Sequence, residues 1–279
     1  MIIDFHTHCF PDKLASTALE TLASAADVQP FTDGTATGLM LAERAAGVDL
    51  SVVLPVATKP EQVRHINNGS IAMNAHTYVT GLLYLGAAHP DDALWAQELR
   101  RLHEAGVRGI KLHPVEQNVP IDDIRYLRIL ELAGELGMIA VLHAGYDLGH
   151  PGNDCCTPQR ILRARRQLGP VTIVLAHMGG WRCWEDVQAL LPDTDVYLDT
   201  AFSLGALTSR TGTDKDCSLL SDDAFCRIVR QFGARRIVFG TDCPWGSPRQ
   251  DLQHIRALPL MAAEKAAILG GNAKRILNL

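Results

Sequence analysis

The chain has 279 residues, of which 47% are hydrophobic and 20% are charged, so it is long enough and apolar enough to bury a sizeable core. The formal net charge is -5 with histidine counted as neutral, and no run of lysine and arginine occurs, so we expect no nucleic-acid partner. No stretch of about 18 apolar residues is present, so we expect no membrane partner either.

The cysteines and the first residues favour a cytoplasmic protein. The seven cysteines are an odd number without a Cys-x-x-Cys pair, which argues against a disulfide framework or a zinc ribbon. Met1 leads directly into Ile2-Ile3-Asp4-Phe5, without a basic segment followed by an apolar stretch, so we expect no signal peptide.

Eight short apolar runs alternate with longer segments along the chain. They are rich in Val, Ile and Leu and nearly continuous, which is typical of strands buried on both faces of a parallel sheet. The runs are Ile2–Phe5, Leu50–Val56, Val79–Leu85, Val107–Leu112, Met138–Leu142, Val171–Ala176, Val196–Leu198 and Ile237–Phe239.

The segments between the runs carry helix signals. One apolar series at helical spacing ends at Gly106, and another begins at Asp222 and ends at Gly233. Eight strands with helical crossovers fit a (β/α)8 barrel or an open doubly wound sheet. With no linker and no internal repeat, we expect a single domain over residues 1–279. Two long connections, at 145–156 and at 201–220, would leave the C-terminal ends of strands, where active-site loops lie.

The first run ends in His6-Thr7-His8, in which the two imidazoles share one face of a strand and can reach one metal ion. Polar residues of the same kind end four later runs. In a barrel these ends converge on one site, and imidazole together with carboxylate suits zinc, manganese or iron better than calcium or magnesium. The later residues are His113, His143, His177 and Asp242.

The ordered motifs resemble the amidohydrolase superfamily, in particular the amidohydrolase-related branch that includes aminocarboxymuconate-semialdehyde decarboxylase and several lactone hydrolases. The resemblance runs from residue 1 to residue 278 and implies a (β/α)8 TIM barrel of the metal-dependent hydrolase type. The motifs are His6-Thr7-His8, Gly109-Ile110-Lys111-Leu112-His113-Pro114, Val141-Leu142-His143-Ala144-Gly145, Ala176-His177-Met178-Gly179-Gly180, Phe239-Gly240-Thr241-Asp242 and Asn272-Ala273-Lys274-Arg275-Ile276-Leu277.

The resemblance implies that His6, His8, His143 and Asp242 hold one divalent metal, which we expect to be zinc, with manganese or iron as alternatives. It also implies that Asp242 takes a proton from metal-activated water, and that His177 is either a second-metal ligand or a free general acid/base. The number of these ligands agrees with a single metal site, since one catalytic metal needs three or four ligands and an open position. Losing such a base costs about 10²–10⁴-fold in rate.

Three interpretations of the role of Lys111 remain open. It can be carboxylated and bridge two metals, it can bind an anionic substrate as an ammonium, or it can neutralise carboxylates at the barrel mouth. The aromatic residues near the site can wall a pocket and Arg182 can bind a carboxylate, although packing within loops explains each of them equally well. The residues expected to contact substrate are Lys111, His113, Tyr146, Trp181, Arg182 and Trp245.

Hydrolysis of a small ester, lactone or amide is therefore the leading function. The partner is a small-molecule substrate, which can be anionic, and the chain can form a homo-oligomer. Metal-dependent, non-oxidative decarboxylation of a small carboxylated substrate is the alternative, because Arg182 or Lys111 can bind the carboxylate. A non-catalytic metal-binding barrel is the alternative of another class, and the presence of both Asp242 and His177 argues against it.

Overall fold

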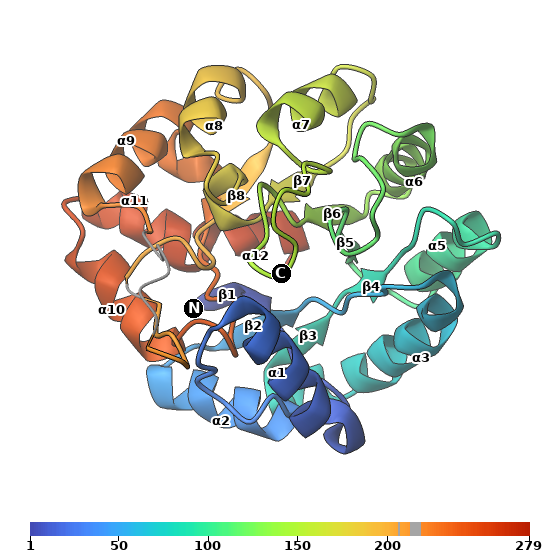
Figure 1. Cartoon of the computed structure of the whole chain (residues 1–279), viewed down its shortest axis with the longest axis horizontal. Helices are drawn as coiled ribbons and strands as arrows, with labels where there is room; N and C mark the ends of the chain where they lie inside the picture. Colours follow the sequence, from blue (N-terminus) through green and yellow to red (C-terminus); the bar gives the residue numbers. More distant parts are fainter. Residues whose placement is uncertain (206, 213–218) are drawn as a thin grey trace.

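The computed structural model describes residues 1–205, 207–212 and 219–279, so the long connection at 201–220 lies partly outside the described residues, as does Cys217. Parallel strands alternate with helices and close into a (β/α)8 barrel, with the helices forming an outer ring (Figure 1). This architecture confirms the barrel fold rather than the open sheet.

The barrel wall consists of two hydrogen-bonded groups of parallel strands, β1 to β3 and β4 to β9. Only Leu85 separates β3 from β4, and its N–H donates to the carbonyl of Val53 at 3.0 Å, so both segments occupy one position in the wall. The N–H of Phe5 donates to the carbonyl of Phe239 at 2.7 Å, which joins the first strand to the last. The strands are β1 (Ile3–Thr7), β2 (Leu50–Val53), β3 (Leu82–Tyr84), β4 (Gly86–Ala87), β5 (Gly109–Leu112), β6 (Ile139–Leu142), β7 (Ile173–Leu175), β8 (Tyr197–Asp199) and β9 (Ile237–Val238).

Helix α9 shows how local sequence signals set the ends of a helix. As predicted, α9 begins at Asp222 and Gly233 follows its last turn. The cap itself is Ser221, whose side chain accepts the N–H of Ala224. The helices are α1 (Asp12–Ala26), α2 (Ala36–Ala46), α3 (Val63–Asn74), α4 (Thr77–Thr80), α5 (Trp95–Glu104), α6 (Ile124–Glu135), α7 (Pro158–Arg165), α8 (Trp184–Leu190), α9 (Asp222–Phe232), α10 (Pro248–Ala257), α11 (Ala262–Ala266) and α12 (Asn272–Leu277), with short turns η1 (Pro60–Gln62), η2 (His177–Gly179), η3 (Ala234–Arg236) and η4 (Ala267–Gly271).

The third strand starts later than its apolar run suggested. Val79 and Thr80 belong to the short helix α4 and not to a strand. Gly81 ends this helix with a left-handed φ of 72°, a conformation that glycine adopts without a steric penalty, and its N–H donates to the carbonyl of Thr77 at 2.7 Å. Apolar character alone does not separate a buried helical turn from the start of a buried strand.

Two apolar layers hold the barrel together. The outer layer packs residues such as Ile110 and Leu112 of β5 against the surrounding helices. The inner layer fills the barrel with Phe5, Val141 and Val174, and Leu277 of α12 packs against it. Alternate residues of β5 and β6 face these two layers. By this alternation Lys111 and His143, at the C-terminal ends of the two strands, point into the barrel.

Cys9 and Cys243 pack with Leu39 and Tyr84 in an outer cluster, facing away from the barrel mouth as strand alternation predicts. The cysteines within the described residues are free thiols. In the same part of the chain, no helix is both long and apolar enough to cross a bilayer.

Candidate metal centre

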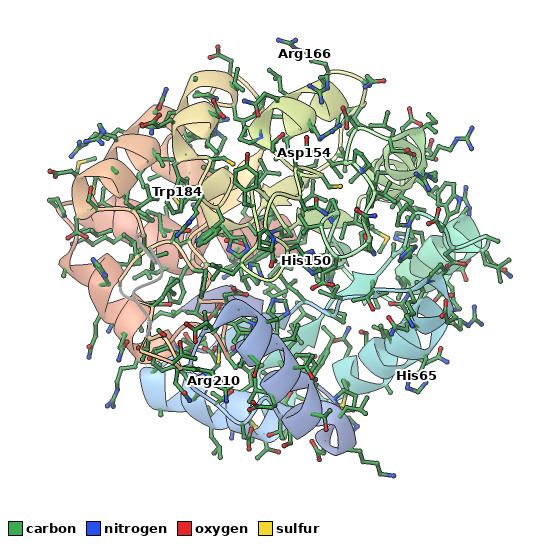
Figure 2. The ribbon with its side chains drawn as sticks, in the orientation of Figure 1. His65, His150, Asp154, Arg166, Trp184 and Arg210 are labelled. Atoms are coloured by element: carbon green, nitrogen blue, oxygen red, sulfur yellow. The ribbon has the colours of Figure 1, made fainter. Side chains whose placement is uncertain are left out.

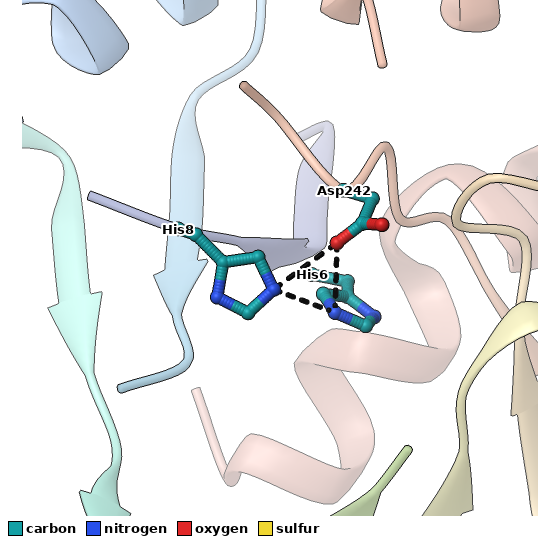
Figure 3. A group of neighbouring side chains, drawn as sticks. All are labelled: His6, His8 and Asp242. Atoms are coloured by element: carbon teal, nitrogen blue, oxygen red, sulfur yellow. Dashed lines mark hydrogen bonds and ion pairs between the residues drawn. The ribbon is translucent and has the colours of Figure 1, made fainter. Parts of the chain in front are cut away.

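His6, His8 and Asp242 direct three ligand atoms at one another (Figure 3). The Nε2 atoms of His6 and His8 are 3.1 Å apart, and Oδ1 of Asp242 lies 3.2 Å and 3.1 Å from them. Ligands about 2.1 Å from a metal ion are separated by about 3.4 Å in a tetrahedron and about 3.0 Å in an octahedron. The triangle therefore has the size that one divalent ion needs.

The far side of each imidazole fixes its tautomer. Nδ1 of His6 donates to Oδ2 of Asp199 at 2.7 Å, and Nδ1 of His8 donates to the carbonyl of Leu54 at 2.8 Å. In neutral rings each Nε2 then presents a lone pair to the Asp242 carboxylate. Three lone pairs that face one another without a proton between them repel, and a cation removes that repulsion. The donor set thus fits a divalent metal.

The backbone brings these atoms together by closing the barrel. The pairing register of β1 shifts between Asp4 and Thr7, which turns His6 toward the barrel mouth although its neighbour Phe5 packs inside. The N–H of Asp242 donates to the carbonyl of His6 at 2.7 Å. Asp242 has a left-handed φ of 63°, a conformation that costs free energy in a residue with a Cβ and is maintained here by the surrounding hydrogen bonds.

Two buried groups of opposite charge, the Asp242 carboxylate and the Lys111 ammonium, lie in this centre. Burial raises the pKa of the Asp242 carboxyl, but the adjacent rings of His6 and His8, which can donate to it when they are protonated, outweigh burial and hold that pKa well below its usual range. Burial lowers the pKa of Lys111 to about 8, against the opposing pull of Asp199 and Asp242. Nζ of Lys111 lies 3.5 Å from Nε2 of His6, so an ionised carboxylate and a buried ammonium flank the same imidazole.

His143 and His177 form a separate pair beside this triangle. Nδ1 of His143 lies 3.1 Å from Nε2 of His177, whose Nδ1 faces the carbonyl of Ala201 at 3.0 Å. Nε2 of His143 faces the carbonyl of Tyr146 at 3.2 Å. Burial lowers the pKa of both rings to about 3, so both are neutral. The ring centres of His177 and His6 are 5.4 Å apart, which places the pair at the same end of the barrel as the triangle.

A second group of possible ligands contains His113, His143 and Asp147. The two rings stack with centres 4.1 Å apart, and their Nε2 atoms lie 3.8 Å and 3.7 Å from Oδ2 of Asp147. The N–H of Glu116 donates to Nδ1 of His113 at 3.3 Å, so a neutral His113 carries its proton on Nε2. A protonated nitrogen offers no lone pair, so this group fits a metal less well than the first.

The remaining predicted substrate contacts surround the mouth. Trp181 is buried, and its Nε1 has no hydrogen-bond partner within the described residues. The exposed guanidinium of Arg182 stacks 4.6 Å above the Trp181 ring. Tyr146 is 38% exposed, and Trp245 lines a cavity of about 50 Å³ together with Phe202.

Two of the histidines outside the strand ends, His65 and His150, are not part of the triangle. His65 lies on α3 at the rim of the molecule, and His150 lies nearer the centre of the view (Figure 2). Nε2 of His150 is 3.2 Å from the carboxylate of Glu116, and the side chain is 40% exposed. His150 therefore belongs to the loops above the barrel and is not one of the three closely spaced ligands.

Sequence reasoning missed Asp199 and Asp147. Asp199 is the last residue of β8 and is completely buried, with contacts to both His6 and His177. The rule that selected the other strand-end residues would also have found it, because it directly follows the seventh apolar run. Asp147 lies in the connection after β6, where no periodic pattern marks one residue above its neighbours.

The comparisons with known proteins agree with this fold. The family model described as Amidohydrolase matches residues 3–279. No curated protein sequence matches the chain. Structures with this architecture include an uncharacterised TIM-barrel protein from Bordetella bronchiseptica, with a TM-score of 0.75 and 18% identity over 99% of this chain and 98% of that one.

Two further similar structures carry functional names. One is 5-carboxyvanillate decarboxylase from Novosphingobium aromaticivorans with bound manganese, with a TM-score of 0.72 and 13% identity over 100% of this chain and 97% of that one. The other is a candidate 2-pyrone-4,6-dicarboxylic acid hydrolase from Pseudomonas putida, with a TM-score of 0.67 and 19% identity over 99% of this chain and 97% of that one. At these identities the likeness concerns the fold.

Proposed function

The chain belongs to the amidohydrolase family, and from that premise we propose that it is a metal-dependent hydrolase that cleaves a small ester, lactone or amide with water as the nucleophile. The observation that carries the proposal is the triangle of His6, His8 and Asp242, whose atoms lie 3.1 Å to 3.2 Å apart. A divalent ion held there would lower the pKa of a water molecule to about 7, so that hydroxide becomes available at neutral pH.

We propose one zinc ion, held by the triangle with His143 as the fourth ligand. Three imidazoles and one carboxylate form a ligand set that zinc accepts readily, and manganese and iron accept the same atoms. His143 would have to turn Nε2 away from the carbonyl of Tyr146 to join the other ligands. We further propose that residues 1–279 act as one domain and that the protein works in the cytoplasm.

Asp242 is proposed as the general base. Its low pKa keeps it ionised at neutral pH, and only Oδ1 faces the two imidazoles, so Oδ2 remains to accept a proton. His177 is proposed as the acid/base group at the leaving-group side; its neutral ring would have to take up a proton on Nε2 before it could polarise the scissile carbonyl or protonate the leaving group. Its ring is held by the Ala201 carbonyl on one side and by His143 on the other, so its orientation is set before substrate binds.

Several groups around the mouth can bind an oxygen-rich substrate, including an anionic one. Nε2–H of His113 and Nε1–H of Trp181 are donors without a close acceptor within the described residues, since Asp147 lies 3.8 Å from the former. Lys111 supplies a buried positive charge. Tyr146, Arg182 and Trp245 are proposed to form the outer wall.

Decarboxylation is the second candidate, and the buried ammonium of Lys111 favours it. A cation 3.5 Å from His6 can hold the carboxylate of a substrate beside the metal. Hydrolysis consumes water, whereas decarboxylation releases carbon dioxide and places a solvent proton on carbon. The two reactions therefore leave different isotopic marks in the product.

The deciding experiment incubates zinc-loaded and manganese-loaded protein with lactones, esters, amides and carboxylated aromatic acids in H₂¹⁸O and in D₂O. Hydrolysis is expected to place one ¹⁸O in the new acid, with activity lost after chelation and restored by the metal. Deuterium on carbon together with release of carbon dioxide would identify a decarboxylase. Tight metal binding without turnover of any substrate class would favour the non-catalytic barrel.

A further inference from the structure

Asp199 is a fully buried carboxylate at the end of β8 that contacts two parts of the site at once. Oδ2 accepts the proton of His6 Nδ1 at 2.7 Å. Oδ1 accepts the backbone N–H of His177 at 2.9 Å and that of Ala201 at 3.0 Å. All three partners are donors, so every contact requires an acceptor on Asp199.

A carboxylate is suited to this position because both of its oxygens accept and neither donates. An amide has one oxygen and one NH₂ group. If its oxygen faced His6, its NH₂ would face the two backbone N–H groups. If its oxygen faced the backbone, its NH₂ would face Nδ1 of His6, which would then have to accept a proton rather than donate one. Neither arrangement satisfies all the donors.

The tautomer of His6 follows from this contact. With the proton on Nδ1, Nε2 keeps a lone pair directed at Asp242 and His8. With the proton on Nε2, the same nitrogen would direct a hydrogen into the triangle and could not bind a metal. His8 has an independent anchor, since its Nδ1 donates to the carbonyl of Leu54 at 2.8 Å.

Asp199 also holds the turn that carries His177. His177 and Met178 have left-handed φ angles of 59° and 52°, which are unfavourable for residues with a Cβ. The hydrogen bond from the His177 N–H to Oδ1 fixes the start of this turn, and the Nδ1 contact to Ala201 fixes the ring. One side chain thus connects the proposed metal ligand with the proposed acid/base.

We propose that Asp199 is a positioning residue that sets the Nδ1-protonated tautomer of His6 for metal binding and holds the backbone turn that orients His177. The metal-binding half of this inference rests on the proposed function, whereas the tautomer belongs to the metal-free protein. Partners of ligating histidines typically change metal affinity by about 10- to 100-fold when they are replaced.

The test compares Asp199→Asn with Asp193→Asn, the same substitution at an exposed position near the start of β8. ¹⁵N NMR of the imidazoles in the metal-free protein, recorded at a pH at which the rings are neutral, reports the tautomers. Wild type and Asp193→Asn are expected to show His6 protonated on Nδ1, and Asp199→Asn is expected to show it on Nε2. The His8 signals should stay unchanged in all three proteins and serve as an internal control.

Zinc affinity, measured by competition with a chromophoric chelator, is expected to fall about 10- to 100-fold in Asp199→Asn and to stay constant in Asp193→Asn. A wild-type His6 protonated on Nε2 would overturn the inference even if the variant failed to fold. An Asp199→Asn protein that keeps both the wild-type tautomer and the wild-type zinc affinity would also overturn it. A tautomer change in a protein that hydrolyses no substrate would instead count against the proposed function alone.

Discussion

His177 and His143 face each other through Nε2 and Nδ1, 3.1 Å apart, while the outer nitrogen of each ring faces a carbonyl oxygen, from Ala201 at 3.0 Å and from Tyr146 at 3.2 Å. Three such contacts need three protons, and two neutral imidazoles carry only two. Because burial lowers the pKa of both rings to about 3, the third proton is absent at neutral pH. His143 therefore gains by turning away from Tyr146 toward a metal ion.

This imbalance separates the roles of the two histidines. We expect His143→Asn to weaken zinc binding by more than the about 10- to 100-fold that loss of a ligand's hydrogen-bond partner costs, since it removes a proposed ligand. We expect His177→Asn to keep nearly all its zinc while its turnover falls sharply. Metal content after gel filtration and kcat check both, with His103→Asn, an exposed change on α5, as the control. If His177→Asn loses zinc as completely as His6→Asn, then His177 is a ligand and the assignment is wrong.

Asp242→Asn tests the general base. The amide oxygen can still bind a metal, but it cannot accept a proton, so kcat is expected to fall by about 10²–10⁴-fold or more while the protein stays folded and keeps part of its metal. Circular dichroism, metal analysis and kcat are measured on the variant and on Asp193→Asn. Near-normal activity of Asp242→Asn would contradict a mechanism in which this carboxylate takes the proton.

Replacing Trp181 is expected to lower the affinity for substrate without lowering the stability of the fold to the same extent, because its Nε1–H has no partner within the described residues. Trp181→Phe removes a donor that has no partner within the described residues, so KM is expected to rise about 2- to 10-fold, the value of one neutral hydrogen bond. Trp184→Phe is the matched control for stability, because Nε1 of Trp184 donates to the His177 carbonyl at 3.0 Å. Urea unfolding should show Trp184→Phe less stable than Trp181→Phe by about 1 kcal/mol. Equal destabilisation of both variants would argue against an unused donor at Trp181.

Glu43 predicts a pH dependence of stability that does not involve the metal centre. Burial and the neighbouring Asp4 carboxyl raise the pKa of the Glu43 side chain in α2 to about 10, against 4.5 for an ordinary glutamate. Between these pH values the folded state binds one more proton than the unfolded state, so the free energy of unfolding falls as pH rises.

Glu43→Gln cannot ionise in either state and should remove this slope. Between pH 6 and pH 8 the variant is expected to lose about 1–2 kcal/mol less stability than wild type. Urea unfolding at several pH values measures the difference, and Glu131→Gln, an exposed change on α6, is the control. Parallel pH profiles for wild type and Glu43→Gln would show that Glu43 is ionised in the folded protein.

Most of the barrel was predictable because buried parallel strands leave continuous apolar runs. The closure was less direct, since it depends on hydrogen bonds such as Phe5 to Phe239 between opposite ends of the chain. The wrong start of the third strand came from Val79 and Thr80, whose helical turn is set by Gly81 rather than by apolar character.

The site residues that directly follow strands could be predicted from the sequence. The residue contacts that form across the barrel could not. His6, His8 and Asp242 share a rim because parallel strands end together. The contact of Asp199 with His6 depends on the register shift in β1, which no periodicity in the sequence marks. The orientation of His143 depends on competition between Tyr146, His177 and a metal, which is a balance of contacts and not a pattern.

The three atoms of the candidate metal centre come from the first strand, from the residue that directly follows it and from the segment after the last strand. During synthesis His6 and His8 are made long before Asp242, so the nascent chain has no carboxylate to complete the triangle until residue 242 has left the ribosome. Two imidazoles on an open strand hold a divalent ion weakly. Tight metal uptake should therefore come after synthesis of the whole barrel, and a fragment that ends before β9 should compete poorly for metal in the cell.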